Sequence, residues 1–191
     1  MSADPTLRPS TDADVPAITA IYAHHVRTGL ASFETEPPVA FEMARRRMDV
    51  VRRGLPFLVA EVDGIVAGYA YAGPYRVRPA YRFTVEDSIY IHPDHTRKGI
   101  GRLLLQAIIS ACEEQGCRQM IAVIGDSGNA ASIGLHRAFG FEHTGTLRSV
   151  GFKFGRWVDT VIMQRPLGPG DTALPADCRA SSGGNSDTPA A

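Results

Sequence analysis

The chain has 191 residues, of which 44% are hydrophobic and 21% are charged, a balance typical of a folded globular protein. Lys and Arg total 20 and Asp and Glu total 20, so the formal net charge is zero, which argues against a general nucleic-acid or membrane-surface binder. No apolar run approaches the roughly 20 residues that span a bilayer, and no basic-then-apolar signal pattern is visible, so we expect a cytoplasmic protein.

Two helices are expected first. The first has an apolar face at helical spacing, and Asp12 or Asp14 can cap it. That face comprises Val15, Ile18, Ile21 or Tyr22, and Val26. A second helix follows Pro37-Pro38, ends at Gly54, and would bury Phe41, Met48 and Val51.

Strands and helices alternate after that. Strands over 56–62 and 65–73 flank Asp63-Gly64, which is typical of a β-hairpin turn. The remaining expected elements are a strand over 83–91, a helix over 99–115, a strand over 119–125, a helix over 129–139 and closing strands over 141–147 and 157–165. Because hairpins accompany the alternation, the fold class is α/β with a mixed sheet flanked by helices.

The composition changes at Gly168. Residues 168–191 contain no aromatic residue and only one large aliphatic residue, Leu174, so we expect a disordered tail after a single domain over 1–167. The three cysteines, Cys112, Cys117 and Cys178, fit no common zinc spacing, and no metal site is expected.

The densest chemical signal lies between Ile89 and Leu105. Gly99 and Gly101 open the long helix, where free N–H groups and the helix dipole favour a phosphate. Arg97, Lys98 and Arg102 would add charged donors. The alternative is an ordinary helix start with solvated basic residues. The segment fits neither a P-loop nor a dinucleotide fingerprint.

The segment HPDHTRKGIG resembles the acetyl-CoA-binding motif of the GNAT N-acetyltransferase superfamily, with Thr96 departing from the usual Arg or Gln at the first position. Downstream, Asn129, Ser132, His136 and Gly140-Phe141 are similar to the next conserved stretch of that family. Several separated segments, including 31–37 and 73–86, resemble its phosphinothricin and methionine sulfoximine acetyltransferase group.

This resemblance implies a mostly antiparallel sheet in which one strand pair splays to form an acetyl-CoA slot. Main-chain groups of Ser88 to Ile91 would bind the pantetheine arm and polarise the carbonyl. The residues expected to bind the cofactor are Ile89, Tyr90, Ile91, Arg97, Lys98, Gly99, Ile100, Gly101, Arg102, Asn129 and Ser132.

Glu86 is the candidate base. Strand alternation places Glu86, Ser88 and Tyr90 on one face and Val85, Asp87 and Ile89 on the other. From spacing alone, Glu86 could instead be an exposed carboxylate on an edge strand or an ion-pair partner of Arg76, Arg78 or Arg82. The resemblance implies that Glu86 deprotonates the amine.

His136 is the candidate acid, placed in the first turns of the helix over 129–139. The resemblance implies that it stands where many relatives carry the tyrosine that protonates the departing thiolate. The alternative is a surface histidine packed on a neighbour.

The expected acceptor is a small amine. Arg76 and Arg78 could bind an α-carboxylate, although an arginine-rich surface loop is the alternative. The expected substrate-binding residues are Phe33, Tyr75, Arg76, Arg78, Glu86 and Ser88, with Tyr81 beside them.

The resemblance implies direct acetyl transfer through a ternary complex to the α-amino group of an amino-acid analogue such as methionine sulfoximine, methionine sulfone or phosphinothricin. It also implies a homodimer with its substrate site near the interface. The rival functions are acetylation of a protein N-terminus, a polyamine or an aminoglycoside, and CoA sensing without turnover.

Overall fold

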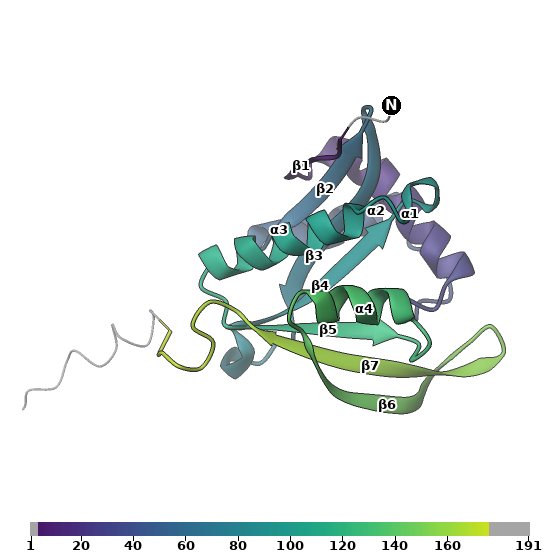
Figure 1. Ribbon diagram of the computed structural model, residues 1–191. Coiled ribbons are helices and arrows are strands. Elements are labelled where there is room, and N and C mark those ends of the chain that lie inside the picture. Colours follow the sequence, from purple (N-terminus) through teal and green to yellow (C-terminus); the bar gives the residue numbers. More distant parts are fainter. Residues whose placement is uncertain (1–3, 176–191) are drawn as a thin grey trace, which may run out of the picture.

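The structure of the protein, a computed structural model, describes residues 4–175 and is built on a seven-stranded sheet (Figure 1). The spatial order is β1-β2-β3-β4-β5-β7-β6. The strands are β1 (Thr6–Pro9), β2 (Phe57–Val62), β3 (Ile65–Pro74), β4 (Thr84–Ile91), β5 (Gln119–Gly125), β6 (Glu142–Lys153) and β7 (Arg156–Pro166). Among the strands that the structure describes, only β4 and β5 pair in parallel, so the mixed, mostly antiparallel sheet is confirmed.

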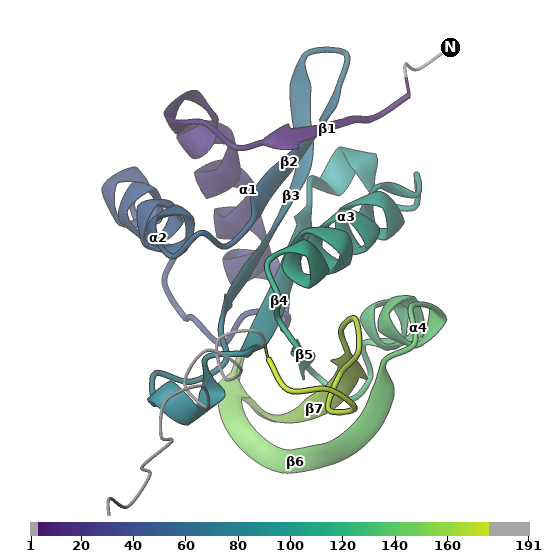
Figure 2. The same ribbon diagram turned by 90° about the vertical axis from the view of Figure 1, so that its left-hand side faces the viewer.

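Within residues 4–175, four α-helices cover the two faces of the sheet (Figure 2). On one face lie α1 (Val15–Thr28) and α2 (Ala40–Arg52), and on the other lie α3 (Ile100–Glu114) and α4 (Ala130–Ala138). The core under α3 contains Leu104 and Ile108, and the core under α1 and α2 contains Ile18 and Tyr69. No described helix is long and apolar enough to cross a membrane.

The prediction for the buried face of α2 is wrong. Phe41, Met48 and Val51 are exposed, and Met43 and Val50 are buried instead. Phe41 and Met48 are seven residues apart, and so are Met43 and Val50, so each pair lies on one side of the helix. Periodicity therefore could not decide which side is buried. Arg46, which lies on the buried stripe, forms an ion pair with Glu34.

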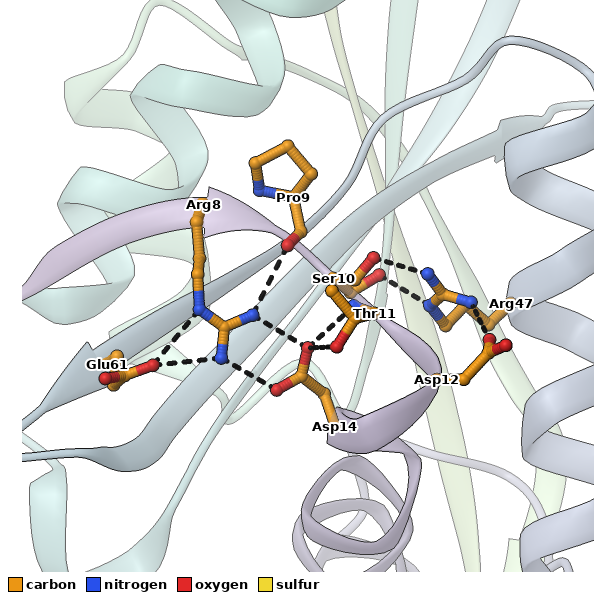
Figure 3. Close-up of polar contacts among 8 residues, drawn as sticks. All are labelled: Arg8, Pro9, Ser10, Thr11, Asp12, Asp14, Arg47 and Glu61. Carbon is orange, nitrogen blue, oxygen red and sulfur yellow. Dashed lines mark hydrogen bonds and ion pairs between the residues drawn. The ribbon is translucent and has the colours of Figure 1, made fainter.

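The N-terminal segment is tied to the sheet by charged contacts (Figure 3). Arg8 bridges Asp14, at 2.8 Å, and Glu61, at 2.9 Å. Arg47 binds Ser10 and Asp12. Asp14 occupies the position before α1, but its carboxylate accepts hydrogen bonds from Arg8 and Thr11 and none from the helix, so the predicted cap by Asp12 or Asp14 does not form.

The beginning of the predicted tail comes directly after β7 in the chain and is part of the described structure. Residues 168–173 form turns and bends in which the Gly170 N–H donates to the Leu167 carbonyl and the Thr172 N–H to the Pro169 carbonyl. The rest of the predicted tail, including Cys178, lies outside the described residues. Cys112 and Cys117 are free and buried.

The feature that positions the site is the parting of β4 from β5. Their pairing runs from Thr84 opposite Gln119 to Asp87 opposite Ala122 and then stops, although both strands continue. The predicted splayed pair is therefore present, and its fork lies at Asp87.

Candidate active site

A slot of about 800 Å³ begins where β4 and β5 part. The free stretch Ser88–Ile91 forms one wall, and 122–126 of β5 and the following loop form the other. Because β4 is unpaired with β5 here, its main-chain groups can bond to a ligand as they would to a missing strand. The slot thus offers a place for an extended, amide-containing arm.

The start of α3 lines one end of the slot. Arg97, Gly99, Ile100, Gly101 and Arg102 all border it, whereas Lys98 does not. Gly99 stands before the helix at φ 80°, in the left-handed region that favours glycine, and Arg97 is also at positive φ. The first N–H groups of α3 and two arginines therefore face the same space, as a diphosphate site requires.

Thr96, at the variable position of the glycine motif, also borders the slot. Its hydroxyl donates to the Pro93 carbonyl at 3.2 Å, so it stabilises the preceding turn. Arg97, the next residue, borders the slot as well and carries a longer, charged side chain.

Residues of α4 also line the slot. The Asn129 side chain caps this helix by accepting a hydrogen bond from the Ser132 N–H, and both residues border the slot. His136 is buried and lies in the last turn of α4, so its predicted place in the first turns is wrong. Its Nε2 is 3.0 Å from Asp87 Oδ2, and its Nδ1 is 2.8 Å from the Ser132 carbonyl oxygen.

Glu86 lies on the other face of β4, toward α1 and α2. The strand is interior to the sheet, which excludes the edge-strand alternative. Arg76 and Arg78 form no ion pair with Glu86, which excludes those two as its partners. Burial, and secondly the charge of Asp87, raise the pKa of Glu86 to about 7. Such a carboxyl group can take a proton near neutral pH.

The connection between α1 and α2 closes the inner end of the slot, with 28–31 on its border. Lys153 of β6 is buried and donates from Nζ to the Gly29 and Ser32 carbonyl oxygens, at 2.9 and 2.7 Å. Gly125 and Gly151 allow close approach of the Leu30 carbonyl and the Phe33 ring, because a Cβ would lie 2.0 Å from the former and 2.4 Å from the latter. Phe33 is thereby held at this connection.

The remaining predicted substrate residues lie beyond β3, outside the lining of the slot. The Arg76 guanidinium carbon lies 5.2 Å from the centre of the Tyr75 ring and 5.9 Å from that of Tyr81. Arg78 is exposed close by. In register, Gly73 of β3 lies opposite Glu86, so this arginine segment follows the strand that runs beside the candidate base.

Sequence reasoning missed Asp87 as a site residue, and also His25, which borders the slot and contacts the Ile91 carbonyl oxygen at 2.8 Å. A signal for Asp87 was present. Alternation placed a carboxylate on the same face as Val85 and Ile89, and a charge among apolar residues indicates a buried partner.

The chain matches the acetyltransferase (GNAT) family model over residues 18–141. It is 62% identical over 170 residues to the phosphinothricin N-acetyltransferase of Alcaligenes faecalis, covering 89% of this chain and 86% of that protein. It is 45% identical over 166 residues to the L-methionine sulfoximine/L-methionine sulfone acetyltransferase of Pseudomonas aeruginosa, covering 86% and 95%.

Among solved structures, a phosphinothricin acetyltransferase from Sinorhizobium meliloti in complex with acetyl-CoA superposes with a TM-score of 0.89. The two chains are 48% identical, and the match covers 91% of this chain and 94% of that one. With the slot, the glycine-opened helix and these relatives in agreement, the chain belongs to the acetyltransferase (GNAT) family.

Proposed function

We propose that the protein transfers the acetyl group of acetyl-CoA to the α-amino group of small amino-acid analogues of the phosphinothricin and methionine sulfoximine class. The observation that carries this proposal is the fork between β4 and β5 at Asp87, because it opens a donor slot at the residue that follows Glu86, a half-buried carboxyl with a pKa of about 7. Donor and base are thus adjacent on one strand.

The residues present fit acetyl-CoA. Arg97, Arg102 and the first N–H groups of α3 would hold the diphosphate, and Ser88–Ile91 would bind the arm. The cosubstrate supplies the acetyl group in activated form, as a thioester. No group of His, Cys, Asp and Glu side chains between residues 4 and 175 could hold a metal ion.

Two side chains would move protons. Glu86 accepts the proton of the attacking amine, directly or through one water, because only the neutral amine has a lone pair for attack. His136, on the slot wall, supplies a proton to the departing sulfur. The amine and thioester are held together in a ternary complex, so positioning contributes to the rate without a covalent enzyme intermediate.

The acceptor would be bound through its α-carboxylate by Arg76 and Arg78, with Phe33, Tyr75 and Tyr81 beside it. Stacking on two tyrosine rings restricts the Arg76 side chain before an acceptor arrives, which reduces the entropy lost on binding. The named activities of the relatives support this acceptor class.

A thiol-release assay with acetyl-CoA tests the proposal. We expect release with phosphinothricin, methionine sulfoximine and methionine sulfone, and little release with a polyamine, an aminoglycoside or an alanine-initiated peptide. The peptide is included because a structure named ribosomal-protein-alanine N-acetyltransferase, from Brucella melitensis, is 42% identical to this chain.

Loss of a charge-assisted bond in Arg78→Ala should raise the acceptor KM about tenfold or more and leave the acetyl-CoA KM unchanged. Arg53→Ala, at the end of α2, is the matched control. Release with the peptide alone would contradict the acceptor class, and binding of acetyl-CoA without release from any amine would favour a sensor.

We also propose a homodimer that acts in the cytoplasm. The edge strand β6, its partner β7 and the turn between them expose a run of large apolar side chains that a second copy could cover: Leu147, Val150, Phe152, Phe154 and Trp157. Cys112 and Cys117, the free thiols among the described residues, are consistent with a reducing compartment.

A further inference from the structure

Gly73 lies inside β3, directly opposite Glu86 on β4. Glycine weakens a strand, because it loses more backbone freedom on folding than any other residue and has no side chain to pack. A glycine within a strand therefore commonly marks a bulge, a close approach of another part of the protein, or the close approach of a ligand. The structure allows each of these reasons to be checked at Gly73.

Nothing within the described residues requires glycine at this position. Gly73 is not among the glycines with a positive φ, and the pairing of β3 with β4 has no register shift. A Cβ at Gly73 would have no heavy atom of the described residues within 4 Å, its chain neighbours aside. Gly68 of the same strand differs, because a Cβ there would lie 2.9 Å from Ile91 Cδ1 and 3.1 Å from the Tyr90 carbonyl oxygen. Packing thus explains Gly68 and leaves Gly73 to be explained by a ligand.

The open space at Gly73, called the notch below, lies beside the candidate base. Residues directly opposite each other point to the same face, so the notch and the Glu86 side chain are both on the side of α1 and α2. The Cβ atoms of such a pair would be about 5 Å apart. Ser88, about 7 Å further along the same face of β4, borders the donor slot. The notch is therefore close to both the base and the slot.

Two tyrosines flank the notch on the same face of the strand. Tyr71 precedes it, and Tyr75 follows it, where the pairing continues through the bond from the Tyr75 N–H to the Thr84 carbonyl. Their Cα atoms are about 13 Å apart along the strand. The Tyr71 ring stacks on Phe57 at 5.0 Å, and the Tyr75 ring is edge-on to Tyr81 at 5.8 Å. Since each ring is held by a partner, the notch stays open between them.

We propose that Gly73 determines acceptor specificity, because its missing side chain leaves the notch in which the acceptor's amino group and the carbon that bears it lie beside Glu86. This rests on the function proposed above. The occupant is an α-amino acid analogue. Its carboxylate lies toward Arg76, which follows Tyr75 in the chain, and its remaining chain lies toward Tyr71. A side chain at position 73 would take the place of the amino-bearing carbon.

The first test requires no acetyl transfer. Binding of methionine sulfone to the protein saturated with CoA, which has no acetyl group to give, is measured by calorimetry. We expect the Kd to be about tenfold higher or more in Gly73→Ala than in the wild type, because a methyl group forced into a filled space is costly, and higher again in Gly73→Val. The Kd for CoA should change by less than about twofold. An equal Kd for the sulfone in Gly73→Ala, or no binding to the wild type, would overturn the proposal.

Thermal stability distinguishes this role from a structural one. Because glycine costs conformational entropy and the new Cβ meets no atom, the Tm of Gly73→Ala should equal or exceed that of the wild type. Gly145→Ala is the matched control, since a Cβ at this glycine of β6 would also meet nothing within 4 Å, and it should leave the Kd for methionine sulfone unchanged. A lower Tm in Gly73→Ala with weaker binding of both sulfone and CoA would refute the proposal in favour of a structural glycine.

The second test is steady-state turnover. In Gly73→Ala, kcat/KM for the acceptor should fall about tenfold or more while the acetyl-CoA KM is unchanged. If the wild type acetylates the sulfone and Gly73→Ala equals it, the notch has no role and the acetyltransferase function stands. If the wild type acetylates no amine, the proposed function fails, and the calorimetric comparison still decides whether the notch holds an amino acid.

Discussion

Glu86 and Asp87 are neighbours in the chain, yet the pleat of β4 sends them into different surroundings. Glu86 faces α1 and α2, where burial raises its pKa to about 7. Asp87 faces α4 and bonds to His136. Strand alternation alone separates the two carboxylates by face.

The role of Glu86 makes a prediction about rate. Glu86→Gln cannot accept a proton, so kcat should fall about 10²- to 10⁴-fold, the usual contribution of a general base. In the wild type, the acid limb of kcat/KM for the acceptor should lie near pH 7, because Glu86 must be ionised. Glu114→Gln, exposed at the end of α3, is the control. Wild-type turnover by Glu86→Gln would eliminate this base.

The same carboxyl group should affect stability. A raised pKa means that the fold favours the protonated form, so stability is lost as pH rises from about 4.5 toward 7 and beyond. Glu86→Gln should therefore raise the Tm at pH 8 more than at pH 5, as calorimetry can measure. An equal effect at both pH values would show that the charge of Glu86 carries no such penalty.

At the scale of elements, the site depends on two features: the end of the pairing between β4 and β5, and the course of the connection between α1 and α2. The ladder between β4 and β5 ends at Asp87, which opens the slot. The connection between α1 and α2 bends across the inner end and is held there by Lys153. Both features are made by contacts between elements distant in the chain.

Lys153 provides the test at this scale. Lys153→Met leaves two carbonyl oxygens without their donor, so unfolding by denaturant should show a loss of about 1–3 kcal/mol. Because Phe33 belongs to the released connection, the acceptor KM should rise, and because residues 28–31 border the slot, the acetyl-CoA KM should rise as well. Arg148→Met, exposed on the same strand, should leave the free energy of unfolding and the KM values unchanged. If the acceptor KM matched that of the wild type, the connection would have no part in acceptor binding.

At the scale of the whole molecule, the two ends of the sheet differ. The β1 edge is tied down by the Arg8 contacts with Asp14 and Glu61 (Figure 3). The β6 edge exposes apolar side chains instead, among them Phe152 at 59% and Trp157 at 65%. This asymmetry is the basis of the proposed homodimer.

A charge on the β6–β7 surface should prevent association. Trp157→Glu should lower the mass measured by sedimentation from that of a dimer to that of a monomer, because burying the carboxylate between copies is costly. Phe41→Glu, on the exposed side of α2, is the matched control and should stay dimeric. A wild-type protein that sediments as a monomer would contradict the proposal directly.

Local spacing in the chain was enough to predict most helices and strands, the Asp63-Gly64 hairpin, the glycine-opened start of α3, and the face of Glu86, since each depends on residues a few positions apart. It could not choose between the two stripes of α2, because Met43 with Val50 and Phe41 with Met48 share the same period. Nor could it pair Asp87 with His136, 49 residues away, or set Lys153 against the Gly29 carbonyl. Those choices depend on how the sheet brings distant segments together and on which buried polar groups must then find partners.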